Sequence, residues 1–190
     1  MRVSKQQAAE NRKKVIEISS HLFRENGFDG IGIADLMKSA GMTHGGFYKQ
    51  FKSKENLAEE ACEAAVEENL SFWNSASSKG GKAGLEELFL AYLSLTHLND
   101  RDTGCLLAAL GAESPRRDSV VRKVFEKAVN AYASVLEALL PETSARKKRQ
   151  KALAILPQMI GALMLSRAVV DEKLSQEILE ATIQDLQRHI

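Results

Sequence analysis

Proline, cysteine and tryptophan are scarce in this chain of 190 residues. There are three prolines, two cysteines and one tryptophan, and no segment alternates apolar and polar residues with a period of two. Because proline interrupts helix interiors, whereas period-two alternation marks half-buried strands, these absences favour helices over a sheet. Cys62 and Cys105 lack a Cys-x-x-Cys spacing, so we predict neither a disulfide framework nor a zinc site, and we expect a reducing cytoplasm.

Signatures of catalysis are missing as well. The sequence contains no Gly-x-Gly-x-x-Gly, P-loop or His-Glu-x-x-His motif and no Ser/His/Asp series. The four histidines are scattered along the chain, and adjacent acids such as Glu59 and Glu60 are typical of a solvated helix face. We therefore predict no enzyme activity, no cofactor and no metal site.

One long apolar stretch needs a choice between a membrane span and a buried helix. Residues 152–170 approach the length of a span, but they contain Pro157, Gln158 and Arg167. Since charges are rare inside spans and a helix that is apolar nearly all round is usually buried, we expect a core helix. The N-terminus also lacks the apolar run of a signal peptide. We predict no membrane partner; a membrane-anchored helical protein is the weaker alternative.

Charge is distributed unevenly along the chain. The net charge is +1, but residues 1–58 hold ten Lys/Arg and six Asp/Glu, which gives +4, and the remainder carries −3. A basic front with a mildly acidic back indicates a head that contacts phosphate and a body that does not.

Apolar residues recur with helical spacing over most of the sequence. The segment 77–84 (SSKGGKAG) is the clearest predicted loop, and Pro115 and Pro141 mark a helix start and a helix end. Together with the short helix described next, the patterns predict an all-α fold of about nine helices. The expected helices cover residues 7–26, 33–40, 54–75, 85–98, 104–112, 115–140, 144–170 and 175 to the C-terminus.

The most informative segment is residues 36–51, LMKSAGMTHGGFYKQF. An apolar helix ends at Ala40, a short turn with Gly41 follows, and a second short helix begins after Thr43, which we predict as its N-cap. Phe47 and Phe51 lie on one face of that helix and leave its polar residues outward. Two short helices joined by a glycine-containing turn form a helix-turn-helix, whose second helix enters the major groove of DNA.

A larger segment, residues 22–57, resembles the TetR family of bacterial transcriptional repressors. The family's order and spacing are followed by Phe23, Gly27, Phe28, Phe47, Tyr48, Phe51, Ser53, Lys54, Glu55 and Leu57. The resemblance implies a three-helix DNA-binding head over residues 1–53 and a ligand-binding and dimerisation body over residues 54–190. It also implies partners: double-stranded DNA with an inverted-repeat operator, a small-molecule effector and a second copy of the chain. Gly46 stands where the family often has threonine, which weakens any transfer of base preference.

Eight residues in the head and at its boundary with the body are predicted to contact DNA. Base edges carry sequence information, whereas phosphates set the register. We expect His44 and Gln50 to reach bases, Lys49 and Lys54 to reach phosphates, and the resemblance gives Tyr48 a phosphate contact as well. The remaining members are Thr43, which we expect near phosphate, and the two small residues Gly45 and Gly46, which let the helix approach the groove.

The resemblance also implies a cavity in the body, mostly apolar with a few polar groups. Tyr92, Thr96 and His97 are candidates for those groups, although ordinary core packing suits each residue too. The predicted lining is Trp73, Phe89, Tyr92, Thr96, His97, Leu106, Leu110, Phe125, Tyr132 and Met159. A homodimer is expected through a four-helix interface made by the last two helices of each subunit. Its predicted residues are Ile155, Met159, Ala162, Leu163, Ser166, Leu174, Ile178, Ala181 and Thr182.

Cys105 is a candidate redox residue. It follows Gly104 at the start of a short helix, where amide dipoles lower a thiol's pKa and raise its reactivity. A Gly-Cys-Leu opening here resembles one branch of the family, in which some members sense oxidants or electrophiles through cysteine. The leading interpretation is a repressor released by a small apolar effector. One alternative function is a cysteine-based sensor, although Cys105 can also be a small buried side chain without a sensing role. The other is a helical ligand-binding protein without specific DNA binding.

Overall fold

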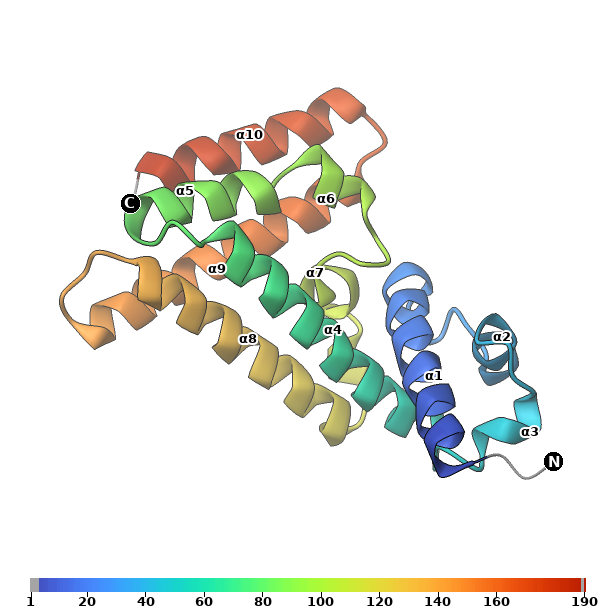
Figure 1. The fold of residues 1–190 in the computed structure, drawn as a ribbon. Coiled ribbons are helices and arrows are strands. Elements are labelled where there is room, and N and C mark those ends of the chain that lie inside the picture. Colours follow the sequence, from blue (N-terminus) through green and yellow to red (C-terminus); the bar gives the residue numbers. More distant parts are fainter. Residues whose placement is uncertain (1–3, 189) are drawn as a thin grey trace.

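The computed structural model describes residues 4–188 and residue 190; positions 1–3 and 189, at the outer ends of the predicted head and body, lie outside the described residues. The described residues form ten α-helices and one 3-10 helix, with no strand among them. This confirms the all-α prediction and the N-terminal helix-turn-helix head. Figure 1 shows the head, α1 to α3, packed beside one end of a bundle formed by the later helices.

The helices follow one another with short connections. Their bounds are α1 (Lys5–Asn26), α2 (Ile33–Ser39), α3 (His44–Phe47), α4 (Lys54–Ala76), α5 (Gly81–Tyr92), α6 (Leu95–Asn99), α7 (Leu106–Leu110), the 3-10 helix η1 (Ser114–Arg116), α8 (Ser119–Leu139), α9 (Ala145–Ala168) and α10 (Glu172–Arg188).

The head is held by a small aromatic core. Gly27 ends α1 with a φ of 78°, and its N–H donates to the Phe23 carbonyl over 2.8 Å. This left-handed C-cap turns the chain so that the rings of Phe23 and Phe28 meet, with centroids 5.5 Å apart. Phe47 and Phe51 are also buried, with ring centroids 5.5 Å apart.

The second helix of the helix-turn-helix is shorter than its pattern suggests. It spans only four residues and then passes into a turn through Tyr48. Thr43 occupies the N-cap position as predicted, although its side chain makes no capping hydrogen bond. Gly45 and Gly46 explain the short length, because each glycine costs a helix about 1 kcal/mol relative to alanine.

The helix α4 connects the head to the body. Ser53 caps it, since its hydroxyl accepts from the Asn56 N–H at 3.1 Å. Along its length it packs against α1 in the head and α8 in the body, and Figure 1 shows α4 and α8 running side by side. Small buried residues such as Ala58, Ala61 and Ala65 permit this close approach.

Several boundaries in the body differ from the predictions; α7 is shorter than expected, α10 begins at Glu172 rather than at residue 175, and three further differences have a local cause. Gly81 to Gly84, expected in a loop, form the first turn of α5. The helix expected over 85–98 is divided in two, because Ser94 caps a new helix by accepting from the His97 N–H at 3.1 Å. Pro115 lies in η1 rather than at the start of α8, which begins at Ser119.

The last two helices pack against each other and against the rest of the bundle. Pro157 lies inside α9, which continues through it without interruption. Proline is tolerated at this position because the carbonyl that loses its donor belongs to Leu153, which is 40% exposed, so no buried residue is left with an unsatisfied group. Among the described residues, no helix is both long and apolar enough to cross a membrane.

Candidate nucleic-acid interface and body cavities

The exposed side of α3 carries an aromatic and a histidine above a buried pair of phenylalanines. Tyr48 is 64% exposed, and its ring stands edge-on to those of Phe47 and His44, at centroid distances of 5.1 and 5.8 Å. Phe47 is fully buried, so the Tyr48 ring packs against a side chain that is held in place, and the His44 ring packs in turn against Tyr48. Lys49 is exposed beside them. This surface therefore presents one cation, one phenol and one imidazole to solvent.

The two glycines of α3 differ in their surroundings. A Cβ added at Gly45 meets nothing within 4 Å, whereas one at Gly46 lies 3.6 Å from both Met37 Cε and Thr43 Oγ1. Gly45 thus faces open space, and Gly46 lies against the first helix of the motif. The open face at Gly45 leaves room for another molecule to approach the backbone.

Two of the predicted DNA-contacting side chains are directed toward the protein. The Gln50 amide donates to the Gly46 carbonyl at 3.4 Å. The Lys54 ammonium donates to the Ile31 carbonyl at 2.6 Å, and partial burial lowers the pKa of that ammonium. An ammonium has three N–H donors, so the Ile31 contact engages one of them and orients Lys54 toward the loop before α2.

A cavity of about 230 Å³ lies between α4, α5 and the α6–α7 connection. Trp73, Thr96 and His97 line it as predicted, and so does Cys105. The other predicted lining residues do not border it. Six of these, Phe89, Tyr92, Leu106, Leu110, Tyr132 and Met159, are at most 1% exposed, and Phe125 is 7% exposed; all seven belong to the packed core.

Sequence reasoning missed most of the polar wall of this cavity. Helical spacing of apolar residues found the core, but the polar lining comes from α4 and from loops that have no periodic signal. The missed residues are Glu68, Asn69, Phe72, Ala91, Ser94, Asp100, Thr103 and Gly104. Phe72 had a usable signal in the sequence, because this aromatic residue directly precedes Trp73.

Asn69 ties the cavity wall to the core. Its carbonyl oxygen accepts from the Leu106 N–H at 2.8 Å and from the Tyr132 hydroxyl at 3.1 Å, and its amide donates to the Gly104 carbonyl at 3.2 Å. Trp73 stacks on Tyr132 with ring centroids 4.8 Å apart. A buried amide with its partners in place fixes the start of α7 relative to α4 and α8.

His97 is held as a neutral imidazole. Its Nδ1 lies 2.7 Å from the Tyr92 carbonyl, to which it donates, and its Nε2 accepts from the Cys105 N–H at 3.0 Å. An acceptor role for Nε2 requires that atom to be unprotonated. Burial also lowers the pKa of His97, because desolvation disfavours the imidazolium, and the nearby Arg167 adds to that effect.

Cys105 differs from the reactive thiol that its position suggested. It is 2% exposed, and burial raises its pKa. The backbone N–H groups of Leu107 and Ala108 and the Tyr92 hydroxyl act in the opposite direction, but their combined effect is smaller. The expected lowering of the pKa by amide dipoles is therefore wrong, because desolvation of the thiolate outweighs it. Burial likewise raises the pKa of Cys62, to about 12.

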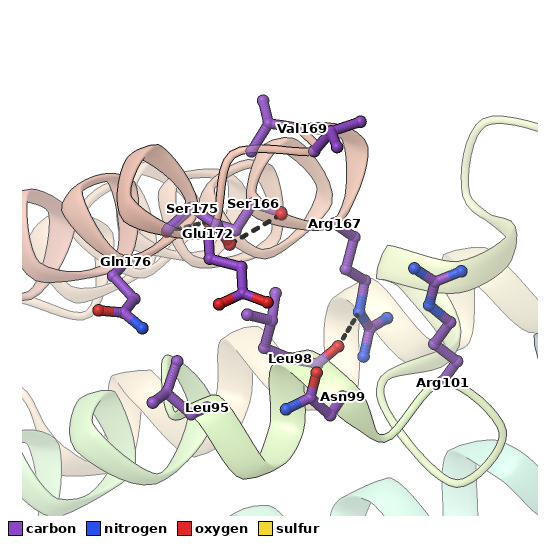
Figure 2. A pocket seen from close by; sticks show the side chains of 11 residues that line it. Leu95, Leu98, Asn99, Arg101, Ser166, Arg167, Val169, Glu172, Ser175 and Gln176 are labelled. Atoms are coloured by element: carbon purple, nitrogen blue, oxygen red, sulfur yellow. Dashed lines mark hydrogen bonds between the residues drawn. The ribbon is translucent and has the colours of Figure 1, made fainter.

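A second cavity, of about 360 Å³, lies between α6 and the turn from α9 to α10. Figure 2 shows Arg167 reaching down from α9 to the carbonyl of Leu98, at 3.1 Å, with Ser166 and Ser175 bonded behind it. The same guanidinium donates to the carbonyls of His97 and Asp100 at 2.6 and 2.8 Å. Arg167 thus satisfies carbonyls at the C-terminal end of α6 and anchors that end to α9.

The predicted dimer residues divide into two groups. Those on α9 are already buried within the protomer, which corrects their assignment to an intersubunit face: Ile155, Met159, Ala162, Leu163 and Ser166. On α10, Leu174 is 43% exposed, Ala181 is exposed, and Ile178 and Thr182 are half-buried. The buried set has the small-residue pattern expected of close helix packing, but it packs inside one chain.

The opposite side of α9 carries a second apolar stripe. Its members recur every three or four residues and are exposed or half-buried: Leu153, Ala154, Pro157, Gly161, Leu165 and Ala168. Leu165 is 60% exposed, and a Cβ added at Gly161 meets nothing within 4 Å. Apolar residues on two faces explain why the sequence pattern selected the wrong one.

The head matches a known family of regulatory proteins. Residues 15–61 match the family model described as bacterial regulatory proteins, tetR family. The HTH-type transcriptional regulator LmrA of Bacillus subtilis is 27% identical over 166 residues, covering 83% of this chain and 86% of LmrA. The HTH-type transcriptional repressor NemR of Escherichia coli is 27% identical over 139 residues, covering 69% of this chain and 67% of NemR.

Solved structures share the fold. The reduced form of E. coli NemR superposes with a TM-score of 0.75 at 21% identity, covering 94% of this chain and 96% of that one. A TetR transcriptional regulator from Chloroflexus aurantiacus gives a TM-score of 0.81 at 24% identity, covering 97% and 96%. At these identities the likeness shows the fold of the head and body together.

The buried imidazole predicts a pH-dependent stability. Because the folded-state pKa of His97 lies below its ordinary value of 6.5, the unfolded chain binds more protons in that window. The contribution of His97 to stability is complete above about pH 6.5 and is lost as the pH falls toward the folded-state pKa. Urea unfolding measured at intervals from about pH 7.5 down to 5 will show this loss for the wild type. His97→Gln, which does not titrate, will show a weaker dependence; equal dependence in both proteins contradicts the assignment.

Proposed function

We propose that the chain is a member of the TetR family of bacterial regulatory proteins, whose model residues 15–61 match, and that it is a repressor that binds an inverted-repeat operator as a homodimer. A small, largely apolar effector releases the DNA. Residues 1–53 act as the DNA-binding head and residues 54–190 as the ligand-binding and dimerisation body, in the cytoplasm. The observation that carries this proposal is the exposed surface of α3, which is polar and open over a rigid aromatic base.

The proposed docking places α3 in the major groove. His44 at its start reads base edges, and the open backbone at Gly45 allows the helix to lie close to them. Tyr48 and Lys49 contact phosphate, helped by the net charge of +4 over residues 1–58. Thr43 and Gly46 border this surface. Gln50 and Lys54 act from its edge, and their internal hydrogen bonds orient them before DNA arrives.

The cavity of about 230 Å³ is the proposed effector site. It is smaller than the 300–1,000 Å³ common for ligand pockets, so it suits a compact ligand. Phe72, Trp73 and His97 supply aromatic surface, while Asn69 and Ser94 supply hydrogen-bonding groups. To release DNA, the ligand must bind the conformation that fits the operator poorly more tightly than the one that fits it.

The homodimer is proposed to form through the exposed stripe of α9 together with α10. Antiparallel pairing of these two helices with their copies gives a four-helix interface. Leu165 and Leu174 supply the large side chains, and Gly161 permits close approach. A two-fold dimer places two heads to read a two-fold operator.

Removing the charge at Lys49 tests the DNA interface. We expect Lys49→Ala to weaken binding to a selected duplex and to reduce the slope of log affinity against log salt by about 1, because one phosphate contact is lost. Lys127→Ala on α8 removes the same charge from an exposed ion pair in the body and serves as the matched control. Fluorescence anisotropy at several salt concentrations gives both slopes.

Base reading is separable from phosphate contact in the same assay. We expect His44→Ala to change the preferred sequence, at a cost of about 1–3 kcal/mol per lost base contact, while the salt slope stays unchanged.

Identical slopes for Lys49→Ala and wild type rule out the docking proposed here. A wild-type protein that retains no duplex specifically supports the alternative of a helical ligand-binding protein without specific DNA binding.

The dimer stripe is tested by placing a charge on it. Leu165→Asp is expected to yield monomers at micromolar concentration, because a carboxylate buried in an apolar interface lacks a partner. Since Leu165 is exposed in the protomer, the fold will survive. Val120→Asp, at an exposed position in the first turn of α8, is the control and remains dimeric. If sedimentation shows that Leu165→Asp is still a dimer, the proposed interface is ruled out.

A cysteine-based signal is the second candidate. Cys105 borders the cavity, and one structural relative is described in a reduced form, E. coli NemR. Against it stands the raised pKa of the Cys105 thiol. The two signals differ in one experiment, DNA release by N-ethylmaleimide. A reversible effector predicts equal behaviour of wild type and Cys105→Ser, whereas a cysteine signal predicts release from the wild type alone.

A further inference from the structure

The connection between α6 and α7, residues 100–105, belongs to two places at once. On one side, Asp100, Thr103, Gly104 and Cys105 line the cavity. On the other side, the carbonyls of Thr103 and Gly104 accept hydrogen bonds from Arg24 in the head. A movement of this part of the cavity wall therefore also moves the carbonyls that hold α1 through Arg24.

Arg24 uses its whole guanidinium in this contact. Its Nη1 donates to the carbonyls of Thr103 and Gly104 at 2.7 and 2.9 Å. Its Nη2 donates to Glu68 Oε2 at 2.6 Å and to the Ser20 hydroxyl at 3.3 Å, and its Nε donates to the Ser20 carbonyl at 3.2 Å. All five donors of the group thus have acceptors. The side chain is 0% exposed, and Glu68 also lines the cavity.

The same connection is held from its far side by Arg167 of α9. Arg167 donates to the carbonyls of His97 and Asp100, just before the segment that Arg24 holds. The connection is also tightly packed, since a Cβ added at Gly104 would lie 2.3 Å from the Asp100 carbonyl oxygen. It is fixed between a helix of the head and a helix of the body.

A second polar contact joins the head to the segment after α7. The Phe28 N–H donates to Glu113 Oε2 at 2.9 Å, and Arg117 pairs with Asp29 at 2.9 Å and with Glu55. The short helix α7 thus has a link to the head before its first residue and another after its last. A displacement of α7 must move the head with it or break one of these contacts.

We propose that Arg24 is the residue that couples the cavity to the DNA-binding head, acting through residues 100–105. The inference rests on the proposed function and deepens its regulation. A ligand that displaces the Thr103 and Gly104 carbonyls removes two acceptors from a buried cation. Glu68 still pairs with the guanidinium, but buried N–H donors without acceptors are unfavourable, so α1 must shift until these donors find partners again. Packed interfaces of this kind switch between discrete arrangements rather than deforming continuously.

The coupling is testable without knowing the effector, because it is reciprocal: DNA must act on the cavity wall as strongly as the ligand acts on DNA binding. The full chain carrying Cys62→Ala leaves Cys105 as the single thiol. Cys105 is buried, so its reaction with DTNB requires the connection to open, and the labelling rate reports that opening. The DNA is a duplex selected from a random library against the unmodified protein.

We expect saturation with this duplex to slow Cys105 labelling about fivefold or more, the lower end of typical coupling free energies. Arg24→Lys keeps the charge but cannot reach both carbonyls and Glu68 together. It will bind the duplex at saturating concentration, yet its labelling rate will be the same with and without DNA. Arg12→Lys is the matched control, since Arg12 lies on α1 and pairs with Glu60 on α4, away from the connection. It retains the slowing.

Two results overturn the inference: a wild-type labelling rate that DNA leaves unchanged, or equal slowing in Arg24→Lys and wild type. If Arg24→Lys does not fold, Arg24→Met combined with Glu68→Gln removes both charges together, and Asn69 still donates to the Gly104 carbonyl. The same comparison then applies to that double variant. A wild-type protein that enriches no duplex from the library fails at an earlier step and refutes the proposed function instead.

Discussion

The cost of burying a cation determines how the head sits on the body. Arg24 brings a full positive charge from α1 to a site without solvent, and the protein must surround it with acceptors. Those acceptors come from three elements: α1 itself, α4 through Glu68, and the connection before α7. A purely apolar contact between head and body would tolerate sliding, whereas five directed hydrogen bonds specify one orientation.

In contrast to the buried Arg24, α3 must keep its outer side uncovered, because DNA binding requires a surface that no other part of the protein contacts. Phe47 and Phe51 supply the packing, so the rest of the helix is released from it. Gly45 and Gly46 weaken the helix in isolation, and it persists because the aromatic base holds it from below. The segment therefore combines a weak helix propensity with strong tertiary packing. This combination keeps α3 folded while its outer side stays open to a DNA groove.

Sequence reasoning succeeded where the signal was local or periodic. The end of the first helix at Asn26, the start of α4 at Lys54 and the Phe47–Phe51 pair are set by neighbouring residues, and each is present in the structure. It failed where the outcome depended on competition between distant elements. The pKa of Cys105 follows from burial by helices far away in sequence, and no pattern within residues 102–106 contains that information. The two apolar sides of α9 were ambiguous for the same reason, since only the packed bundle shows which side it covers.

The single tryptophan of the chain has a consequence of another kind. Trp73 is 1% exposed, stacks on Tyr132 and borders the cavity of about 230 Å³. Its indole emission therefore arises from one known place, without background from any other indole in the chain. The protein carries its own optical label at the site where a small molecule would enter, so unmodified protein is sufficient for screening compound libraries by fluorescence quenching.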